Sequence, residues 1–281
     1  MTLSVHGRSL KILHISFLII LLSSIKTSAQ ILVGPVVGGQ INWMVFENKD
    51  NKEFYKLKPI PSYHAGISLA FRAQKRFFLQ TSFLYAQKGK RLESIDNSGT
   101  RNDMTFKYLD IPILYTAEFK AKLGKEKVYK WYFGVGPTIS YWLGGKGVLI
   151  NGDLNENFIN PPNYDLHYKI VFNKDSVAVD EMNVREPNRI QLGLNASAGL
   201  IFEPYGNHKI MVNVRYSFGQ SFLSRNGKGE FGLPGILYYQ DELRVRSREL
   251  VLSLNYFIDL KTDQRKKGKS TLKVNNEKSK K

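Results

Sequence analysis

The chain has 281 residues, a formal net charge of +17 and no cysteine. The missing cysteines exclude a disulfide framework, thiolate metal sites and a cysteine nucleophile. Hydrophobic residues make up 42% of the chain and aromatic residues 12%, which argues against a bundle of membrane helices and suits strands whose two faces differ.

The first 29 residues have the features of a secretion signal. Arg8 and Lys11 precede an apolar run over 12–22, and Thr27 and Ala29 are small residues placed for cleavage before Gln30. The run is too short to cross a bilayer as a helix. We therefore expect a signal peptide over 1–29 and a mature chain that starts at Gln30.

Beyond Gln30, apolar residues recur at every second position, which is the period of a strand. Many of the segments with this pattern have 11 or more residues, enough for a tilted strand to cross a bilayer. The sequence predicts eight strands, at 31–45, 62–72, 76–88, 104–120, 128–143, 189–204, 208–219 and 247–260.

Short and long connections alternate between these strands. Three are short: 73–75, about seven residues near Gly124, and 205–207. Four are long: 46–61, 89–103, 144–188 and 220–246. Outer-membrane barrels have short periplasmic turns and long external loops. The prediction is an all-β fold, an eight-stranded antiparallel up-and-down transmembrane barrel over 30–260, with both termini in the periplasm.

Aromatic residues are expected to form two girdles, at the levels where amphipathic rings meet the membrane surface. The inner girdle would contain Phe71, Phe77, Phe119, Tyr129, Trp131, Phe202 and Tyr256. The outer girdle would contain Trp43, Tyr63, Tyr85, Tyr141, Trp142 and Tyr216. The alternative is a soluble eight-stranded barrel with its apolar face inside, but such a barrel needs neither strands this long nor aromatic residues at both ends.

The polar face of the strands is then the lumen, which eight strands leave just wide enough to be filled by side chains. Buried charges persist when they are paired, so Asp110 or Glu118 is expected to pair with Arg72 or Arg215. The predicted polar network of the lumen consists of Arg72, Lys88, Asp110, Glu118, Lys130 and Arg215. A plugged barrel is the first interpretation, and a narrow pore or small-ligand site is the alternative.

No catalytic or cofactor-binding pattern stands out, so neither an enzyme nor a cofactor or metal is predicted. The histidines lack metal-ligand spacing. His167 with Asp165, in the predicted loop 144–188, is the one candidate for surface chemistry, and 168–179 is a candidate small hairpin. The glycine-rich run 144–147 is interpreted as the entry to that loop, because no helix follows it.

The last 21 residues contain nine basic and two acidic side chains, which predicts a disordered basic tail over 261–281 in the periplasm. Because much of the excess charge lies at the two ends of the chain, it does not indicate a nucleic-acid partner.

The segment 108–114 reads Tyr-Leu-Asp-Ile-Pro-Ile-Leu, after an upstream strand that ends Tyr-Ala-Gln-Lys-Gly at 85–89. This pair resembles the PorT-like outer-membrane β-barrels of Bacteroidetes. The resemblance covers about 31–260 and implies a role in type IX protein secretion. Pro112 lacks a donor for the ladder, so a bulge or kink is expected there.

These observations predict a non-enzymatic structural or accessory barrel of the bacterial outer membrane, with protein secretion as one role. The alternatives are a small-solute channel or ligand-binding barrel, and an adhesin or enzyme that uses the surface loops. The expected partners are outer-membrane lipid and other envelope or secretion proteins.

Overall fold

The computed structural model describes residues 30–47, 51–74, 76–95, 100–123, 127–150, 165–204, 207–232 and 241–260. The predicted signal peptide and basic tail lie outside the described residues. Within the described ranges, no helix is long and apolar enough to cross a membrane.

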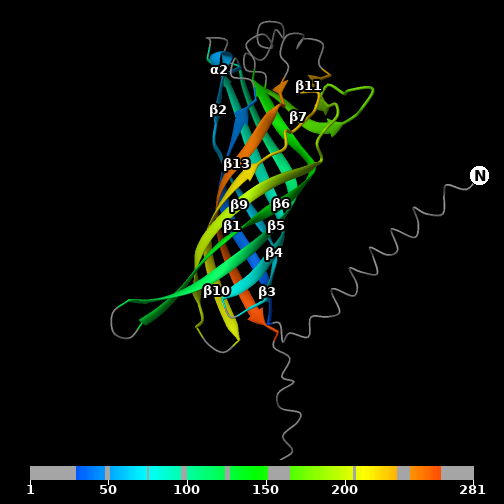
Figure 1. Ribbon diagram of the computed structural model, residues 1–281. Coiled ribbons are helices and arrows are strands. Elements are labelled where there is room, and N and C mark those ends of the chain that lie inside the picture. Colours follow the sequence, from blue (N-terminus) through cyan, green and yellow to red (C-terminus); the bar gives the residue numbers. More distant parts are fainter. Residues whose placement is uncertain are drawn as a thin grey trace, which may run out of the picture.

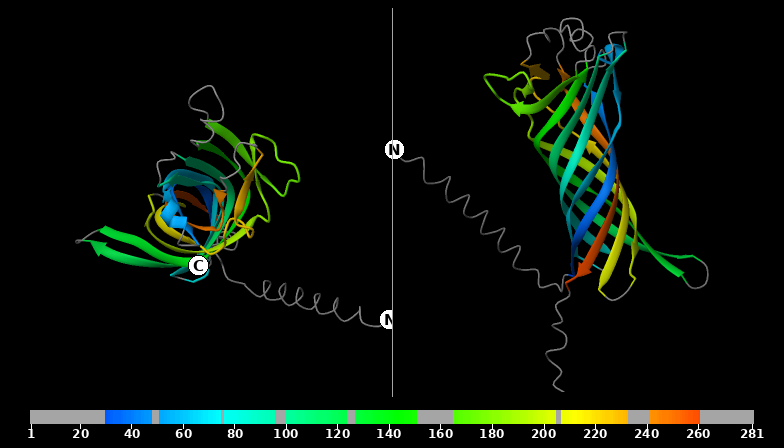
Figure 2. Two further views of the ribbon diagram at one scale, coloured as in Figure 1. Left: turned by 90° about the horizontal axis from the view of Figure 1, so that it is seen from above. Right: turned by 180° about the vertical axis from the view of Figure 1, so that it is seen from behind.

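Eight strands form a closed antiparallel ring in chain order, which confirms the predicted eight-stranded barrel (Figures 1 and 2). The ring closes where β13 pairs with β1, for example Leu254 with Val37. Its strands are β1 (Ile31–Phe46), β3 (Ile60–Arg72), β4 (Phe77–Ser94), β5 (Arg101–Leu123), β6 (Lys127–Ile150), β9 (Ile190–Phe202), β10 (His208–Gly219) and β13 (Val245–Asp259).

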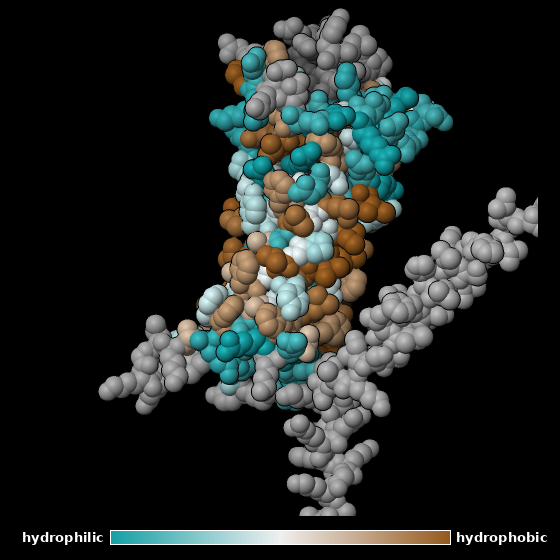
Figure 3. Space-filling model, viewed as in Figure 1, coloured by the Kyte–Doolittle hydropathy of each residue, from teal (hydrophilic) through white to brown (hydrophobic). Residues whose placement is uncertain are grey.

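Apolar side chains point outward around the middle of this ring. Val37, Ile67, Leu194 and Leu252 are each more than half exposed. A space-filling view shows the result as a hydrophobic band between two hydrophilic ends of the barrel (Figure 3). We call the end that contains Gln30 and Leu260 the inner end and the opposite end the outer end. Water does not stabilise such a continuous apolar surface, whereas lipid does.

Three strands extend farther toward the outer end of the barrel than the alternation predicts. β4 continues to Ser94, β5 begins at Arg101, and β6 continues to Ile150. Most of 89–103 is therefore strand rather than loop, and the glycine-rich run 144–147 lies inside β6 instead of starting a loop. The register between β5 and β6 shifts at Lys107/Tyr108. No shift occurs at Pro112, which pairs with Thr138 in register, so the bulge expected there does not form. On the other side of β5, the ladder with β4 is interrupted beside Pro112, between the pairs Thr81–Ile113 and Leu84–Asp110, without a change of register.

The long connections contain further secondary structure at the outer end. We call β7 (Asp165–Phe172), β8 (Glu181–Val184), β11 (Lys228–Phe231) and β12 (Asp241–Glu242) the outer sheet. It continues the barrel wall from β6, because β7 pairs with β6 over 145–150. β7 and β8 are parallel, so the hairpin expected at 168–179 does not form. The first long connection contains α2 (Asn51–Phe54) and β2 (Tyr55–Lys58), which pairs with β4.

At the opposite end, the β5–β6 hairpin projects beyond its neighbours (Figure 1). β4 pairs with β5 only as far as Ala117, and β9 pairs with β6 only from Lys130. We call the described residues of the projecting part, 119–123 and 127–129, the inner hairpin. Phe119 stacks on Trp131 at its base, with ring centres 4.5 Å apart.

Candidate functional site

The inward side chains of the barrel form layers along its axis. An apolar cluster, here called the outer plug, fills the outer end. Its members are Met44, Phe46, Ala86, Leu92, Met104, Phe106, Tyr108, Trp142, Leu149, Leu166, Tyr168, Ile170, Met182, Val184, Leu223, Leu243 and Val245. A smaller apolar cluster, the inner plug, lies near the inner end. It consists of Leu32, Ala70, Phe78, Tyr132, Ile201, Met211 and Phe257. The predicted polar lumen is the layer between the two plugs.

The strand β5 shows how the sequence produces these layers. Its even-numbered residues face inward along the whole barrel. Met104 and Phe106 lie in the outer plug, Asp110 lies in the polar layer, and Glu118 lies near the inner end. The inward face therefore changes from apolar to polar along one strand without a change in its period.

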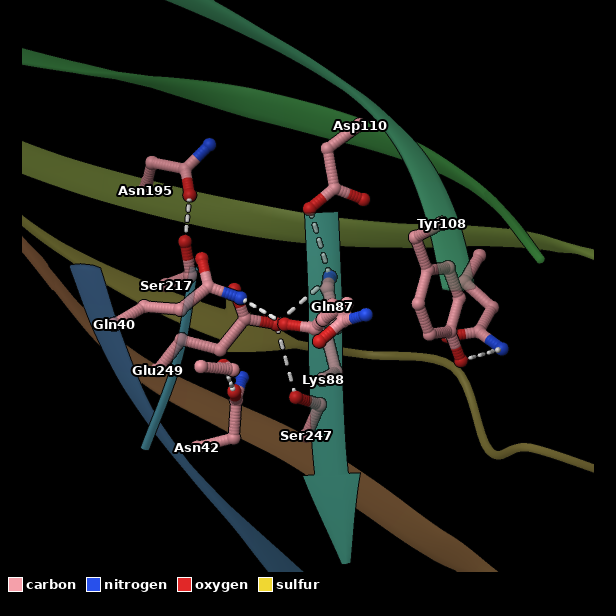
Figure 4. A network of polar contacts seen from close by, with 12 residues as sticks. Gln40, Asn42, Gln87, Lys88, Tyr108, Asp110, Asn195, Ser217, Ser247 and Glu249 are labelled. Atoms are coloured by element: carbon pink, nitrogen blue, oxygen red, sulfur yellow. Dashed lines mark hydrogen bonds and ion pairs between the residues drawn. The ribbon is translucent and has the colours of Figure 1, made fainter. Parts of the chain in front are cut away.

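Lys88 and two carboxylates form the centre of the polar layer (Figure 4). The ammonium of Lys88 lies 3.0 Å from Asp110 Oδ2 and 2.8 Å from Glu249 Oε1, and all three residues are buried. It also lies 4.6 Å from the centre of the Tyr108 ring, which adds a cation–π contact. Arg215 is buried beside the same cavity. The four side chains carry two positive and two negative charges, which suits a buried cluster.

Hydroxyl and amide groups continue the polar layer toward the inner plug. His64 Nε2 lies 2.8 Å from Ser253 Oγ. Ser68 donates to Asn255 Oδ1 at 2.8 Å, and its oxygen lies 2.6 Å from Ser82 Oγ. These contacts connect β3 with its neighbour β4 and, past β1, with β13, so they tie together four consecutive strands on one side of the barrel.

A second group of charges lies at the inner rim. Arg72 donates to Glu118 at 2.6 Å, and Lys130 lies 3.9 Å from the same carboxylate. Glu203 forms ion pairs with Lys130 and with Lys209. This chain of alternating charges links β3, β5, β6, β9 and β10 below the inner plug.

The structure thus divides the six residues of the predicted network into two groups. Lys88, Asp110 and Arg215 lie in the polar layer, and Arg72, Glu118 and Lys130 lie at the inner rim. Of the expected pairings, Arg72 with Glu118 is present as an ion pair.

Sequence reasoning missed three charged residues that matter here. Glu249 lies within the predicted strand 247–260, and like Ser253 and Asn255 it is an odd-numbered, inward-facing residue, so following the alternation two residues back from Val251 would have found it. Lys90 forms an ion pair of 2.7 Å with Asp241, and both side chains are fully buried in the outer plug. No periodic signal marks Asp241, which comes from a predicted loop.

Trp142 was expected in the outer girdle, but it is fully buried in the outer plug. Its ring packs edge-on against Phe106 and Phe172, and its indole nitrogen donates to the carbonyl of Gly144 at 3.0 Å. The prediction failed because Trp142, like Ser140, is an even-numbered residue in this part of β6, and these residues face the lumen.

The polar layer holds little free space. The cavity bordered by Lys88, Asp110, Arg215 and Glu249 has a volume of about 20 Å³. That is room for about one water molecule. A second cavity, between Arg72 and Phe78 at the inner plug, measures about 10 Å³. At these two levels, side chains of the described residues therefore fill most of the interior.

The candidate pair for surface chemistry lies on the outer sheet, where His167 borders an open cavity of about 510 Å³ together with Asp103 and Asp180. Asp165 and His167 are both exposed on β7, and among the described residues no hydrogen bond or ion pair joins them. The described residues also contain no cluster of three His, Asp or Glu side chains able to hold a metal ion.

A family model described as "Outer membrane protein beta-barrel domain" matches residues 26–222. No curated protein sequence matches the chain. Among solved structures, OprG from Pseudomonas aeruginosa gives a TM-score of 0.42 at 8% identity, covering 82% of this chain and 94% of its own. Neisserial surface protein A gives a TM-score of 0.34 at 10% identity, and the match covers 83% of this chain and 97% of that protein. A third match is Ail, the attachment invasion locus protein of Yersinia pestis, in complex with a heparin analogue. It gives a TM-score of 0.33 at 12% identity, and the match covers 82% of this chain and 99% of that protein.

Proposed function

The chain belongs to the outer membrane protein beta-barrel domain family, and we propose that it is a closed, non-enzymatic barrel. We propose further that the barrel holds the outer sheet at the cell surface, where the sheet contacts other envelope proteins. The single observation that carries this proposal is the closure of the barrel. Two apolar plugs enclose a charge-balanced polar layer whose cavity admits about one water molecule.

The outer sheet supplies a surface suited to protein contacts. It lies beyond the hydrophobic band and continues the barrel wall through β7 (Figure 2). Charged side chains on or next to the outer sheet, Lys169, Asp180 and Arg185, are each more than half exposed, which gives a polar surface for such contacts. At the opposite end, β4 pairs with β5 only as far as Ala117, so the described part of β5 beyond it is an open strand edge. Such edges bind extended segments of other proteins by adding a strand.

The orientation follows from the connections. Gln30 and Leu260 lie at the end with short turns, since Leu260 donates to the carbonyl of Ile31 at 2.8 Å. Barrels of this class have short turns on the periplasmic side. We therefore propose periplasmic termini, with the outer sheet on the cell surface. An accessory role in protein secretion, which the PorT-like resemblance implies, stays a proposal of the same kind.

Two alternatives fit the interior less well. A small-solute channel needs a continuous wet path, and the two plugs interrupt it. An enzyme needs reacting groups that are joined to one another, whereas among the described residues no hydrogen bond or ion pair joins His167 to Asp165.

The proposal is tested with two versions of the chain in cells. In the second version a short Gly-Ser linker replaces residues 145–189, and the direct pairing of Tyr141 with Ile190 keeps β6 and β9 joined. We expect chemical crosslinking to envelope proteins in the full chain and its loss in the linker version. Heat-modifiable gel mobility shows that the shortened barrel still folds. Identical crosslinked partners with and without 145–189 would contradict the proposed role of the outer sheet.

Closure is tested in planar lipid bilayers with the full chain. We expect no steady conductance above the bare membrane. Stable, reproducible conductance steps would favour the channel alternative.

A further inference from the structure

Two arginines lie on the outward face of β13, directly above the hydrophobic band. Leu250, Leu252 and Leu254 face outward in the band, and Arg248 and Arg246 occupy the next two outward positions. Successive outward positions on a strand are about 6.6 Å apart. The two guanidinium groups therefore lie at the height where the apolar surface ends.

Aromatic side chains fix that height. Arg248 is paired in register with Trp43 on β1 and with Phe218 on β10. Trp43 lies beside Tyr216, with ring centres 6.2 Å apart, and both belong to the predicted outer girdle. Such rings sit at the level of the lipid headgroups, so Arg248 lies at headgroup level and Arg246 one step farther out.

Both arginines lie over aromatic rings rather than in ion pairs. The Arg248 guanidinium lies 5.2 Å from the Phe218 ring centre, and that of Arg246 lies 4.3 Å from the Phe222 ring centre. Among the described residues neither forms an ion pair. The cation–π contacts position each side chain, and within the described ranges no ion pair competes with an anion for its N–H groups.

A small cavity connects the two side chains. It has a volume of about 160 Å³ and is bordered by Val45, Phe46, Glu47, Phe218, Arg246 and Arg248. Glu47 is the acid in this lining, and its carboxylate forms an ion pair with Arg244. Glu242 also lies beside Arg244 and accepts a hydrogen bond from its backbone N–H at 2.8 Å. Three arginines therefore face two carboxylates, and the group keeps a net positive charge.

From this geometry we infer that Arg246 and Arg248 form a binding site for a phosphate group of an outer-leaflet lipid. The lipid chains would lie along the outward leucines of β13, and the phosphate would enter the cavity between the two guanidinium groups. Arginine recognises phosphate through paired N–H donors. This inference depends on the barrel's position in the membrane and not on the role proposed for the outer sheet.

The test compares three proteins in detergent: the natural chain, Arg246→Gln/Arg248→Gln, and the control Lys169→Gln/Arg185→Gln. The control removes the same charge from exposed outer-sheet positions whose ion pairs stabilise little. Each is titrated with a phosphorylated glycolipid of the lipid A type, with the same glycolipid lacking phosphate, and with inorganic phosphate. The readouts are thermal unfolding and native mass spectrometry, after heat-modifiable mobility has shown that all three are folded.

We expect the phosphorylated glycolipid to stabilise the natural chain and the control equally. Loss of two charge-assisted contacts should weaken its binding to the double variant by roughly tenfold or more. The glycolipid without phosphate and inorganic phosphate should produce little shift. Equal binding by the double variant would overturn the inference. An equal effect of inorganic phosphate alone would overturn the assignment to lipid.

Discussion

Lys88 is the residue on which the polar layer depends, because two buried carboxylates share its charge. Lys88→Met leaves Asp110 and Glu249 without a lysine between them. Removing one partner of a buried pair typically costs about 3–5 kcal/mol, so the midpoint of urea unfolding in lipid vesicles should fall markedly. The control is Lys174→Met, which breaks an ion pair with Glu181 whose lysine is half-exposed and should change stability by less than about 1 kcal/mol. Equal losses in the two variants would contradict this account of the polar layer.

The Lys90–Asp241 pair attaches β12 to the barrel from inside the outer plug. Asp241→Leu leaves a buried ammonium without its carboxylate, and we expect the outer sheet to become protease-sensitive while the barrel stays folded. The double change Lys90→Met/Asp241→Leu removes both charges and should restore much of the protection, because apolar residues of similar volume replace buried pairs well. A double variant as sensitive as Asp241→Leu would show that the pair does more than balance charge.

Asp103 gives the outer ends of β4 and β5 a pH dependence. Burial raises its pKa, but hydrogen bonds from Arg101 and Arg91 outweigh this and hold the pKa below its ordinary value of 3.8. The carboxylate therefore stabilises this region above its ordinary pKa, and the stabilisation is lost as the pH falls through the lowered value. We expect acid-induced protease sensitivity over 89–103, and Asp103→Asn should show the sensitivity already at neutral pH. If Asp103→Asn kept the protection of the natural chain, the ion pairs would have no stabilising role.

At the scale of elements, the alternation of apolar residues was sufficient to predict all eight barrel strands. It failed where the phase of the alternation changes. In β6, Tyr141 and Leu143 face outward, whereas beyond Gly144 it is the even-numbered Lys146 and Val148 that do so. A bulge inserts one residue and exchanges the two faces. A pattern search with a fixed phase therefore ends at 143, although the strand continues to Ile150.

Gly144 makes that change of phase possible, since its φ of 153° lies in a region that other residues rarely adopt. Inserting one alanine between Gly145 and Lys146 should turn Leu149 outward and Lys146 into the outer plug, because the strand beyond the bulge shifts by one residue. We expect proteolysis to reach the outer sheet while heat-modifiable mobility shows an intact barrel. Deleting Gly144 removes the extra residue of the bulge and leaves a regular strand with Leu149 still inward, so it should have a smaller effect. Unchanged protection after the insertion would mean that the bulge does not set the faces.

For the whole molecule, the sequence predicted the closed ring, the direction of its apolar face and the polar character of its central layer. It predicted a plugged lumen, but with a polar filling, and did not predict the two apolar plugs. The outer plug combines residues from β1, β4, β5, β6, β7, β8 and the segment near β12, and no local pattern specifies which of these meet. The expectation of a lumen polar from end to end was therefore too simple, because Phe106 and Phe257 occupy inward positions beyond the polar layer.

The most direct test of the account is which face of each strand contacts lipid. The natural chain has no cysteine, so single cysteines carry spin labels without background. Labels at Leu194 and Leu254, outward in the hydrophobic band, should collide with oxygen dissolved in lipid and be shielded from a water-soluble nickel chelate. Asn255 is buried in the polar layer. In a folded variant with a label there, neither the oxygen in the lipid nor the nickel chelate should reach the label. Free access of the nickel chelate to the labels at Leu194 and Leu254 in a folded, lipid-reconstituted protein would contradict the account.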